Sequence, residues 1–203
     1  MDNKQATLEL GTKPVGKLLM QYALPAIIAM TAASLYNMID SIFIGQGVGA
    51  MAISGLAITF PFMNLTAAFG AAVGIGASTY LSVKLGQKDY KTAERILGNN
   101  VTLNIVIGIA VGAVSLLFLD PILRFFGASH QTLPYAREYM TVILAANVFS
   151  QLFYGTNAVL RATGKPKQAM FITIATVVMN AILAPIFIWG CGLGISGAAY
   201  ATV

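Results

Sequence analysis

The stretch Leu18–Ile39 reads LLMQYALPAIIAMTAASLYNMI and contains 22 consecutive residues without a charged side chain. A helix of about 20 mostly apolar residues is long enough to cross a bilayer core of about 30 Å. The stretch is too long for the apolar core of a signal peptide, and no clear small-residue cleavage site follows it. It therefore predicts a retained transmembrane helix.

The composition of the whole chain also indicates a membrane protein. Of its 203 residues, 57% are hydrophobic and only 9% are charged, whereas a soluble domain carries about 25% charged residues. Lipid is the solvent in which such a surface is stable. The single cysteine, Cys191, excludes an internal disulfide.

Further apolar segments follow the first one. Between Asp40 and Lys84 lie 43 uncharged residues, too many for one helix, and the clustered glycines of residues 45–49 predict a break there. A second glycine-rich break covers residues 190–194. We expect further spans over Ile53–Val83 (with Pro61 inside it), Val101–Leu119, Pro134 or Tyr139 to Leu160, and Ala169–Trp189, and the start of a sixth at Ser196.

The predicted fold class is therefore an all-α integral membrane protein, a polytopic helical bundle of five complete transmembrane helices plus the start of a sixth. Residues 1–17 are predicted to form a cytoplasmic N-terminal segment and residues 18–203 the bundle in the lipid bilayer. Because the sequence stops at Val203, soon after the sixth segment opens, we expect it to be part of a longer protein.

The basic residues fall almost entirely on one side in this topology. Only Arg124 and Arg137, of the twelve lysines and arginines, lie on the other side. An excess of basic residues marks the cytoplasmic side, so we expect a multi-pass protein of the plasma (inner) membrane with a cytoplasmic N-terminus. The net charge of +5 is thus a topology signal, and no nucleic-acid partner is expected. The ten on the predicted inner side are Lys4, Lys13, Lys17, Lys84, Lys88, Lys91, Arg95, Arg161, Lys165 and Lys167.

Asp40 is the only acidic residue within a long apolar region. An aspartate at the centre of a membrane helix costs about 2.5–3.5 kcal/mol on insertion scales, so it should face protein or a water-filled cavity. Tyr36 and Asn37 share its helical face through i, i+4 and i, i+3 spacing. Such a group could bind a proton or a sodium ion and exchange it for a cationic solute. The alternative is that Asp40 marks the outer end of the first span, about 33 Å from Leu18.

Two uncharged polar stripes would point into the bundle. Thr173, Thr176 and Asn180 follow helical spacing, and so do Asn147, Gln151 and Tyr154. Interhelical bonding, worth about 0.6 kcal/mol per contact, is the alternative to a binding role. The Gly70-x-x-x-Gly74 and Gly108-x-x-x-Gly112 pairs indicate close helix packing. The candidate substrate-binding residues are Tyr36, Asn37, Gln151, Tyr154, Asn157 and Thr176.

Pro25 removes a backbone hydrogen bond inside the first span, so it is expected to kink the helix and is the candidate conformational residue.

No arrangement typical of an enzyme is present. The single histidine, His130, lies in a predicted outer loop without metal-ligand spacing, and no nucleophile elbow, zinc motif or phosphate-binding loop occurs. We therefore expect neither an enzyme nor a cofactor other than a coupling ion.

The sequence resembles the multidrug and toxic compound extrusion (MATE) family of secondary transporters over essentially its whole length. No one motif is decisive, but their order and spacing together are specific. The motifs that carry the resemblance are Phe60–Phe62 (FPF), Gly74–Ser78 (GIGAS), Leu85–Gly86, Leu160–Lys167 (LRATGKPK) and Gly194–Thr202 (GISGAAYAT).

The resemblance implies two six-helix lobes, of which this chain is the first, with alternating access and a C-terminal lobe of the same polypeptide as partner. It implies roles for Pro25 and Asp40 in the first helix. It also implies a cation site in the first lobe, formed by Asp40, Asn180 and Thr202, where a sodium ion could bind. The sequence departs from this pattern at Ala184, because the family members that have such a cation site carry a second aspartate at this position. With one carboxylate a sodium site would be weaker, so sodium and proton coupling both stay open.

The resulting hypothesis is a secondary active transporter that exports amphipathic organic cations or drugs by antiport with sodium ions or protons. One alternative keeps the fold but transports a lipid-linked saccharide. That cargo would need several basic residues in the cavity to hold a pyrophosphate, and the predicted spans contain none. The other alternative is a channel or scaffold without coupled transport.

Overall fold

The computed structural model describes residues 14–203, which form helices and turns with no strand among them. The all-α fold class is therefore confirmed. Lys4, Lys13 and most of the predicted N-terminal segment lie outside the described residues. The helices are α2 (Val15–Gly47), α3 (Ala50–Gly86), α4 (Tyr90–Leu117), α5 (Leu119–Phe125), α6 (Leu133–Ala145), α7 (Asn147–Ala162), α8 (Pro166–Pro185), the short π-helical turn η1 (Ile186–Gly190) and α9 (Gly194–Thr202).

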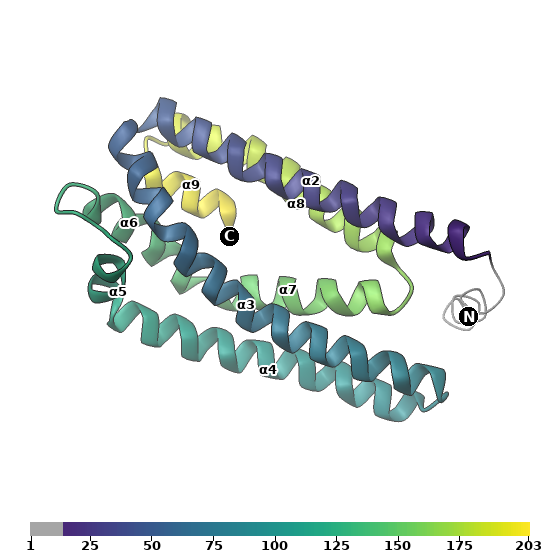
Figure 1. Ribbon diagram of the computed structural model, residues 1–203. Helices are drawn as coiled ribbons and strands as arrows, with labels where there is room; N and C mark the ends of the chain where they lie inside the picture. The colour runs from purple at the N-terminus through teal and green to yellow at the C-terminus, as the bar shows by residue number, and fades with distance from the viewer. Residues whose placement is uncertain (1–13) are drawn as a thin grey trace.

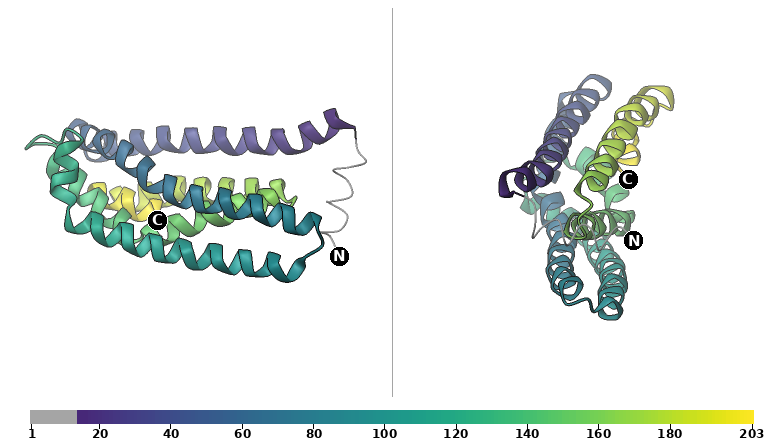
Figure 2. Two further views of the ribbon diagram at one scale, coloured as in Figure 1. Left: turned by 60° about the horizontal axis from the view of Figure 1, so that its bottom comes forward. Right: turned by 90° about the vertical axis from the view of Figure 1, so that its right-hand side faces the viewer.

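The long helices run along a common axis and form two groups (Figures 1 and 2). In one group α2 packs along α8, and α9 packs against α8 and η1. In the other, α3 packs along both α7 and α4. Helix α6 connects the two groups, since it contacts α3 and α9.

The first helix is longer than the sequence predicts. Helix α2 continues from Val15 through Asp40 to Gly47 and ends at the predicted glycine break, where Gly49 takes a φ of +117° that favours glycine. Asp40 therefore does not mark the end of the helix, which continues for seven residues beyond it. The carboxylate projects from within a continuous helix.

The third helix also begins earlier than the predicted span. Helix α4 starts at Tyr90 rather than Val101, because the Asp89 side chain accepts a hydrogen bond of 3.2 Å from the Thr92 amide and caps the helix. The apolar pattern marks only the part of a helix that lies in lipid. The charged first turns of α4 extend the helix beyond it.

The fourth span is broken. Helices α6 and α7 are bent by 60° at Ala146, with neither proline nor glycine at the break. The Asn147 side chain donates to the Gly108 carbonyl of α4 at 3.0 Å, which fixes the start of α7 against a neighbouring helix. Within residues 14–203, four single helices are long and apolar enough to cross a membrane, and the bent pair, taken as one span, gives a fifth. The predicted number of spans is therefore confirmed by length and composition.

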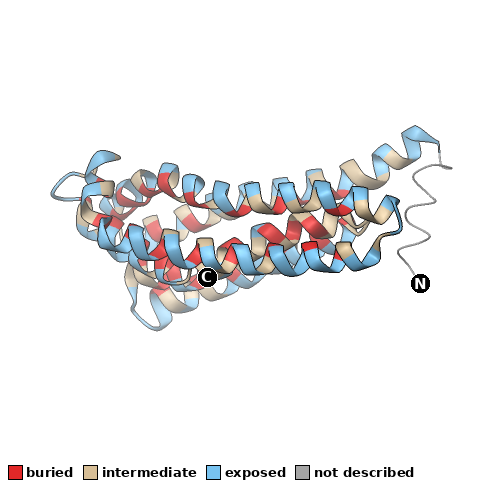
Figure 3. Ribbon diagram, turned by 90° about the horizontal axis from the view of Figure 1, so that it is seen from below, coloured by how far each residue is buried: buried red, intermediate tan, exposed pale blue. Residues whose placement is uncertain are grey.

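The outer surface of the bundle is apolar. Buried residues gather between the helices and exposed ones on their outer faces (Figure 3). Many exposed side chains are large and hydrophobic, including Ile109, Phe149 and Phe171. A soluble monomer rarely exposes so much contiguous apolar surface, which agrees with a bundle that lies in a bilayer.

Candidate functional site

Asp40 lies at the centre of the candidate site. Its side chain is on α2, and the residue is only 4% exposed. The carboxylate oxygen Oδ1 is buried without a hydrogen-bond partner among the described residues. Because an ionised buried carboxylate is unstable without compensation, this group favours either a proton or a cation beside it.

A chain of hydrogen bonds joins three helices next to Asp40. The Tyr36 hydroxyl of α2 donates to Oγ1 of Thr202 on α9 at 2.9 Å, and the Asn180 amide of α8 donates to the same oxygen at 3.4 Å. Thr202 in turn donates to the Ala198 carbonyl at 2.9 Å. The structure thus brings Asn180 and Thr202 together, and Tyr36 joins them.

Tyr139 is a member of the site that sequence reasoning missed. It lies on α6, is 1% exposed, and its phenol is within electrostatic reach of Tyr36, Asp40 and the Thr202 hydroxyl. It directly follows Arg137 and Glu138 in the sequence, so it did not stand out as a polar group in an apolar run. Spacing along one helix could not reveal it, because its partners come from α2 and α9.

We call Tyr36, Asp40, Tyr139, Asn180 and Thr202 the Asp40 cluster. It offers one carboxylate and several neutral oxygens, including the buried Oδ1 of Asn180, which also has no partner among the described residues. Hard cations prefer such oxygen donors. Within the described residues no three His, Cys, Asp or Glu side chains converge, and Ala184 is fully buried without a carboxylate of its own.

The other candidate substrate-binding residues are not all joined to this cluster. Tyr154 of α7 is exposed and lies within electrostatic reach of Tyr36. Asn37 is exposed and donates to the Ala33 carbonyl of its own helix at 3.1 Å. Thr176 is exposed and donates to the Thr173 carbonyl at 2.8 Å.

Gln151 and Asn157 lie between helices. Gln151 is completely buried, and its amide donates to the Thr66 carbonyl of α3 at 2.8 Å. Asn157 donates to the Thr173 hydroxyl of α8 at 3.4 Å and accepts from Arg161 at 3.0 Å. This geometry favours the interhelical-bonding alternative for both residues.

Pro25 is buried within α2. It lies fifteen residues before Asp40, which is about 22 Å along a helix. No backbone amide can bond at that position, so α2 has a weak point on the N-terminal side of Asp40.

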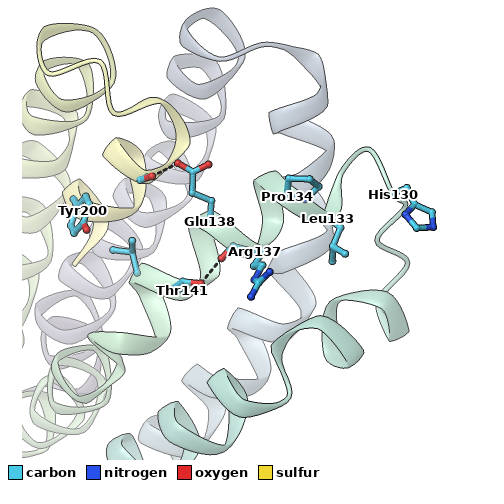
Figure 4. A pocket seen from close by; sticks show the side chains of 9 residues that line it. His130, Leu133, Pro134, Arg137, Glu138, Thr141 and Tyr200 are labelled. Carbon is cyan, nitrogen blue, oxygen red and sulfur yellow. Dashed lines mark hydrogen bonds between the residues drawn. The ribbon is translucent and has the colours of Figure 1, made fainter.

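A hollow of about 530 Å³ opens elsewhere, between α6 and α9 (Figure 4). Its charged side chains have partners: Glu138 accepts a hydrogen bond from Ser196, and Arg137 lies 3.4 Å from Asp120. No member of the Asp40 cluster lines this hollow. The cluster is therefore the stronger candidate site, since its polar groups are buried and incompletely paired.

A bundle of apolar spans that buries one carboxylate among hydroxyl and amide groups has the features of a membrane transporter of small solutes. The family model MatE matches residues 25–186. The chain therefore belongs to the MATE family of multidrug export transporters.

Relatives and solved structures agree with this assignment. The multidrug export protein MepA of Staphylococcus haemolyticus is 32% identical over 186 residues, which cover 92% of this chain and 41% of that protein. MepA of Staphylococcus aureus is 33% identical over 189 residues, 93% of this chain and 42% of that protein. The chain thus spans about two fifths of the length of these relatives.

Among solved structures, the MATE multidrug transporter DinF-BH is similar with a TM-score of 0.87 and 35% identity, over 95% of this chain and 43% of that one. A MATE family transporter of the MOP superfamily in an outward-facing conformation has a TM-score of 0.84 and 29% identity, over 91% and 41%. These neighbours are polytopic helical membrane transporters, as the sequence predicts for this chain.

Proposed function

We propose that this chain forms the N-terminal lobe of a secondary active transporter that exports amphipathic organic cations by antiport with sodium ions or protons. The single observation that carries the proposal is Asp40, a membrane-buried carboxylate with an oxygen that has no partner among the described residues. The similarity to the multidrug export protein MepA supports the general activity.

Coupling follows from competition for one negative charge. A proton or a sodium ion at Asp40 neutralises the carboxylate, and so does a cationic solute, but a small buried site favours only one at a time. Tyr36, Asn180 and Thr202 supply neutral oxygens that would complete the coordination of a sodium ion. A single carboxylate suits a weakly held, exchangeable ion better than a tightly held one.

The substrate would contact the polar side chains near this cluster. Tyr36 and Tyr154 offer aromatic faces, which attract organic cations, and Asn37 and Thr176 offer exposed hydrogen-bonding groups. Gln151 and Asn157 remain predictions as substrate residues.

Pro25 is the proposed bending point of α2 during alternating access between this lobe and a C-terminal lobe. We place the transporter in the plasma (inner) membrane with a cytoplasmic N-terminus, from the distribution of basic residues.

The test is transport by the full-length protein in liposomes. A fluorescent organic cation is followed while a sodium gradient or a pH gradient is imposed separately, for wild type, Asp40→Asn and Asp120→Asn. Asp120 provides a matched control, because it is an aspartate on α5 outside the long spans. We expect one gradient to drive transport, Asp40→Asn to abolish it and Asp120→Asn to leave it unchanged. Unimpaired transport by Asp40→Asn would show that coupling does not pass through this residue.

A further inference from the structure

Two turns at the same end of the bundle have the same backbone design (Figure 1). At the α3–α4 turn the Asp89 amide donates to the Lys84 carbonyl at 3.0 Å and the Lys88 amide to the Leu85 carbonyl at 3.1 Å. At the α7–α8 turn the Lys165 amide donates to Leu160 at 3.1 Å and the Gly164 amide to Arg161 at 3.3 Å. Both patterns are Schellman motifs, which place one residue in the left-handed region.

The residue in that left-handed position differs between the two turns. The α7–α8 turn has Gly164 there, with a φ of +79°, whereas the α3–α4 turn has Lys88, with a φ of +61°. Within the described residues Lys88 is the only non-glycine residue with a positive φ. A Cβ atom is strained in this region, so glycine would be the more stable choice for the turn itself. The lysine at this position therefore indicates a function other than stabilising the turn.

Lys88 belongs to a group of basic side chains on the surface of the α3–α4 hairpin. Lys91 and Arg95 lie one helical turn apart at the start of α4, so they share a face. All three residues are exposed, and none forms an ion pair within the described residues. The Lys84 ammonium, in contrast, donates a hydrogen bond of 3.0 Å to the Gln87 amide oxygen and lies 3.8 Å from the Asp89 carboxylate. We call Lys88, Lys91 and Arg95 the inner basic patch.

The hairpin holds this patch in place. Leu81 of α3, Ala93 and Ile96 of α4 and Val159 of α7 form one small buried cluster beneath it. The Asp89 cap fixes the start of α4. Tyr80 and Tyr90 are both exposed, and the Lys84 ammonium lies 5.7 Å from the centre of the Tyr80 ring. Exposed tyrosines beside lysines are typical of the headgroup region of a bilayer.

The charge at this end is unbalanced. Within the described residues eight basic side chains lie there, against the acidic residues Asp89 and Glu94. At the opposite end, basic and acidic side chains balance: Arg124 and Arg137 against Asp120 and Glu138. The eight are Lys17, Lys84, Lys88, Lys91, Arg95, Arg161, Lys165 and Lys167.

We propose that the inner basic patch is a docking site for the headgroup of an anionic phospholipid, held by Lys88, Lys91 and Arg95 at the tip of the α3–α4 hairpin. A phosphodiester is complementary to three unpaired cations on a rigid support, and membrane insertion brings the lipid to the correct level. The proposal concerns the membrane contact of the lobe and does not depend on the coupling chemistry at Asp40.

The experiment uses the full-length protein in neutral detergent, with phosphatidylglycerol or phosphatidylcholine added. The bound lipid is counted by native mass spectrometry, and the melting temperature is measured with and without lipid. We expect phosphatidylglycerol to be retained and to raise the melting temperature, because a ligand of the native state stabilises it. The double variant Lys91→Gln/Arg95→Gln should weaken that binding about tenfold or more, and the matched double variant Arg124→Gln/Arg137→Gln should not.

Lys88→Gly is the decisive variant, because the proposal predicts opposite changes in two properties. Without lipid it should raise the melting temperature by about 2 °C through relief of strain, yet it should reduce the stabilisation by phosphatidylglycerol. Equal stabilisation by both lipids, an equal loss in the Arg124/Arg137 control, or displacement of the lipid by inorganic phosphate would each overturn the proposal. An unchanged lipid response in Lys88→Gly and in Lys91→Gln/Arg95→Gln would do the same.

Discussion

The α3–α4–α7 group and the α2–α8–α9 group both bury polar side chains, but they pair them differently. In the first group Asn147 and Gln151 bond to backbone carbonyls of neighbouring helices. In the second, Tyr36, Asn180 and Thr202 bond to one another beside an unpaired carboxylate. An amide that bonds to a fixed backbone oxygen holds two helices together, whereas side chains that bond to each other can exchange partners.

In the first group the long helices approach each other closely enough for backbone contact. A Cβ atom at Gly74 of α3 would lie 2.8 Å from the Cα of Gly155 on α7, and one at Gly108 of α4 would lie 2.8 Å from the Cα of Val148. Backbone contact of this kind confirms the close packing that the glycine pairs predict. Neutral amide atoms such as Oε1 of Gln151 also lack partners there, but an unpaired amide is less costly than an unpaired carboxylate. The comparison therefore assigns a packing role to the first group, and the unpaired carboxylate of the second group supports the exchange proposed there.

The largest expected effect on stability is at the close contact in the first group. Gly74→Ala would push a methyl group into the backbone of Gly155, so the free energy of unfolding of the full-length protein should fall by about 1–3 kcal/mol. Gly76→Ala is the matched control, since no atom lies within 4 Å of a Cβ atom there. That control should be neutral or slightly stabilising. Equal losses in both variants would contradict the assignment of close packing to this face.

The second group should respond in the opposite direction. Asp40→Asn removes a buried charge that has an unpaired oxygen, so the free energy of unfolding at neutral pH should rise by about 1 kcal/mol. The gain in stability should accompany the loss of transport. A stability measurement in detergent and the liposome assay on the same preparation check both. A destabilised Asp40→Asn protein would indicate that the carboxylate holds the helices together, as the amides of the first group do.

Features that depend on local sequence were predictable, and features that depend on contacts between distant helices were not. Asp40 stood out as an acid in an apolar run, and residues 45–49 marked the first break by their glycines. The bend at Ala146 carries no such signal, because it depends on Asn147 bonding to another helix. Helical spacing placed Asn37 and Asp40 on one face, but Asn37 is exposed and Asp40 buried. Spacing gives a shared face without saying how much of it a neighbouring helix covers.

A smaller effect distinguishes bonding from substrate contact at Gln151. Gln151→Leu removes the bond to the Thr66 carbonyl, so the comparison predicts a loss of about 0.6 kcal/mol in stability with an unchanged substrate profile. Tyr154→Leu, on the same helix and exposed, should instead change the affinity for organic cations without a comparable loss of stability. Transport assays with several cations, together with thermal unfolding, separate the two results. A changed substrate profile in Gln151→Leu would return this residue to the binding site.

The smallest expected effect lies at the end of the first group, where α4 has a side-chain cap and α2 and α8 have none. Hydrogen bonds from Thr92 to the Asp89 carboxyl, with a smaller contribution from nearby Lys84, lower the pKa of Asp89. A carboxyl with a lower pKa in the folded state stabilises the fold above its unfolded pKa of about 3.9, and this contribution is lost as the pH falls through the folded value. Asp89→Ala should therefore melt at a slightly lower temperature than wild type at pH 7, with a difference that shrinks towards zero below about pH 3. Thermal unfolding of both proteins across this range measures it, and a difference that persists in acid would mean that the carboxylate charge does not stabilise the hairpin.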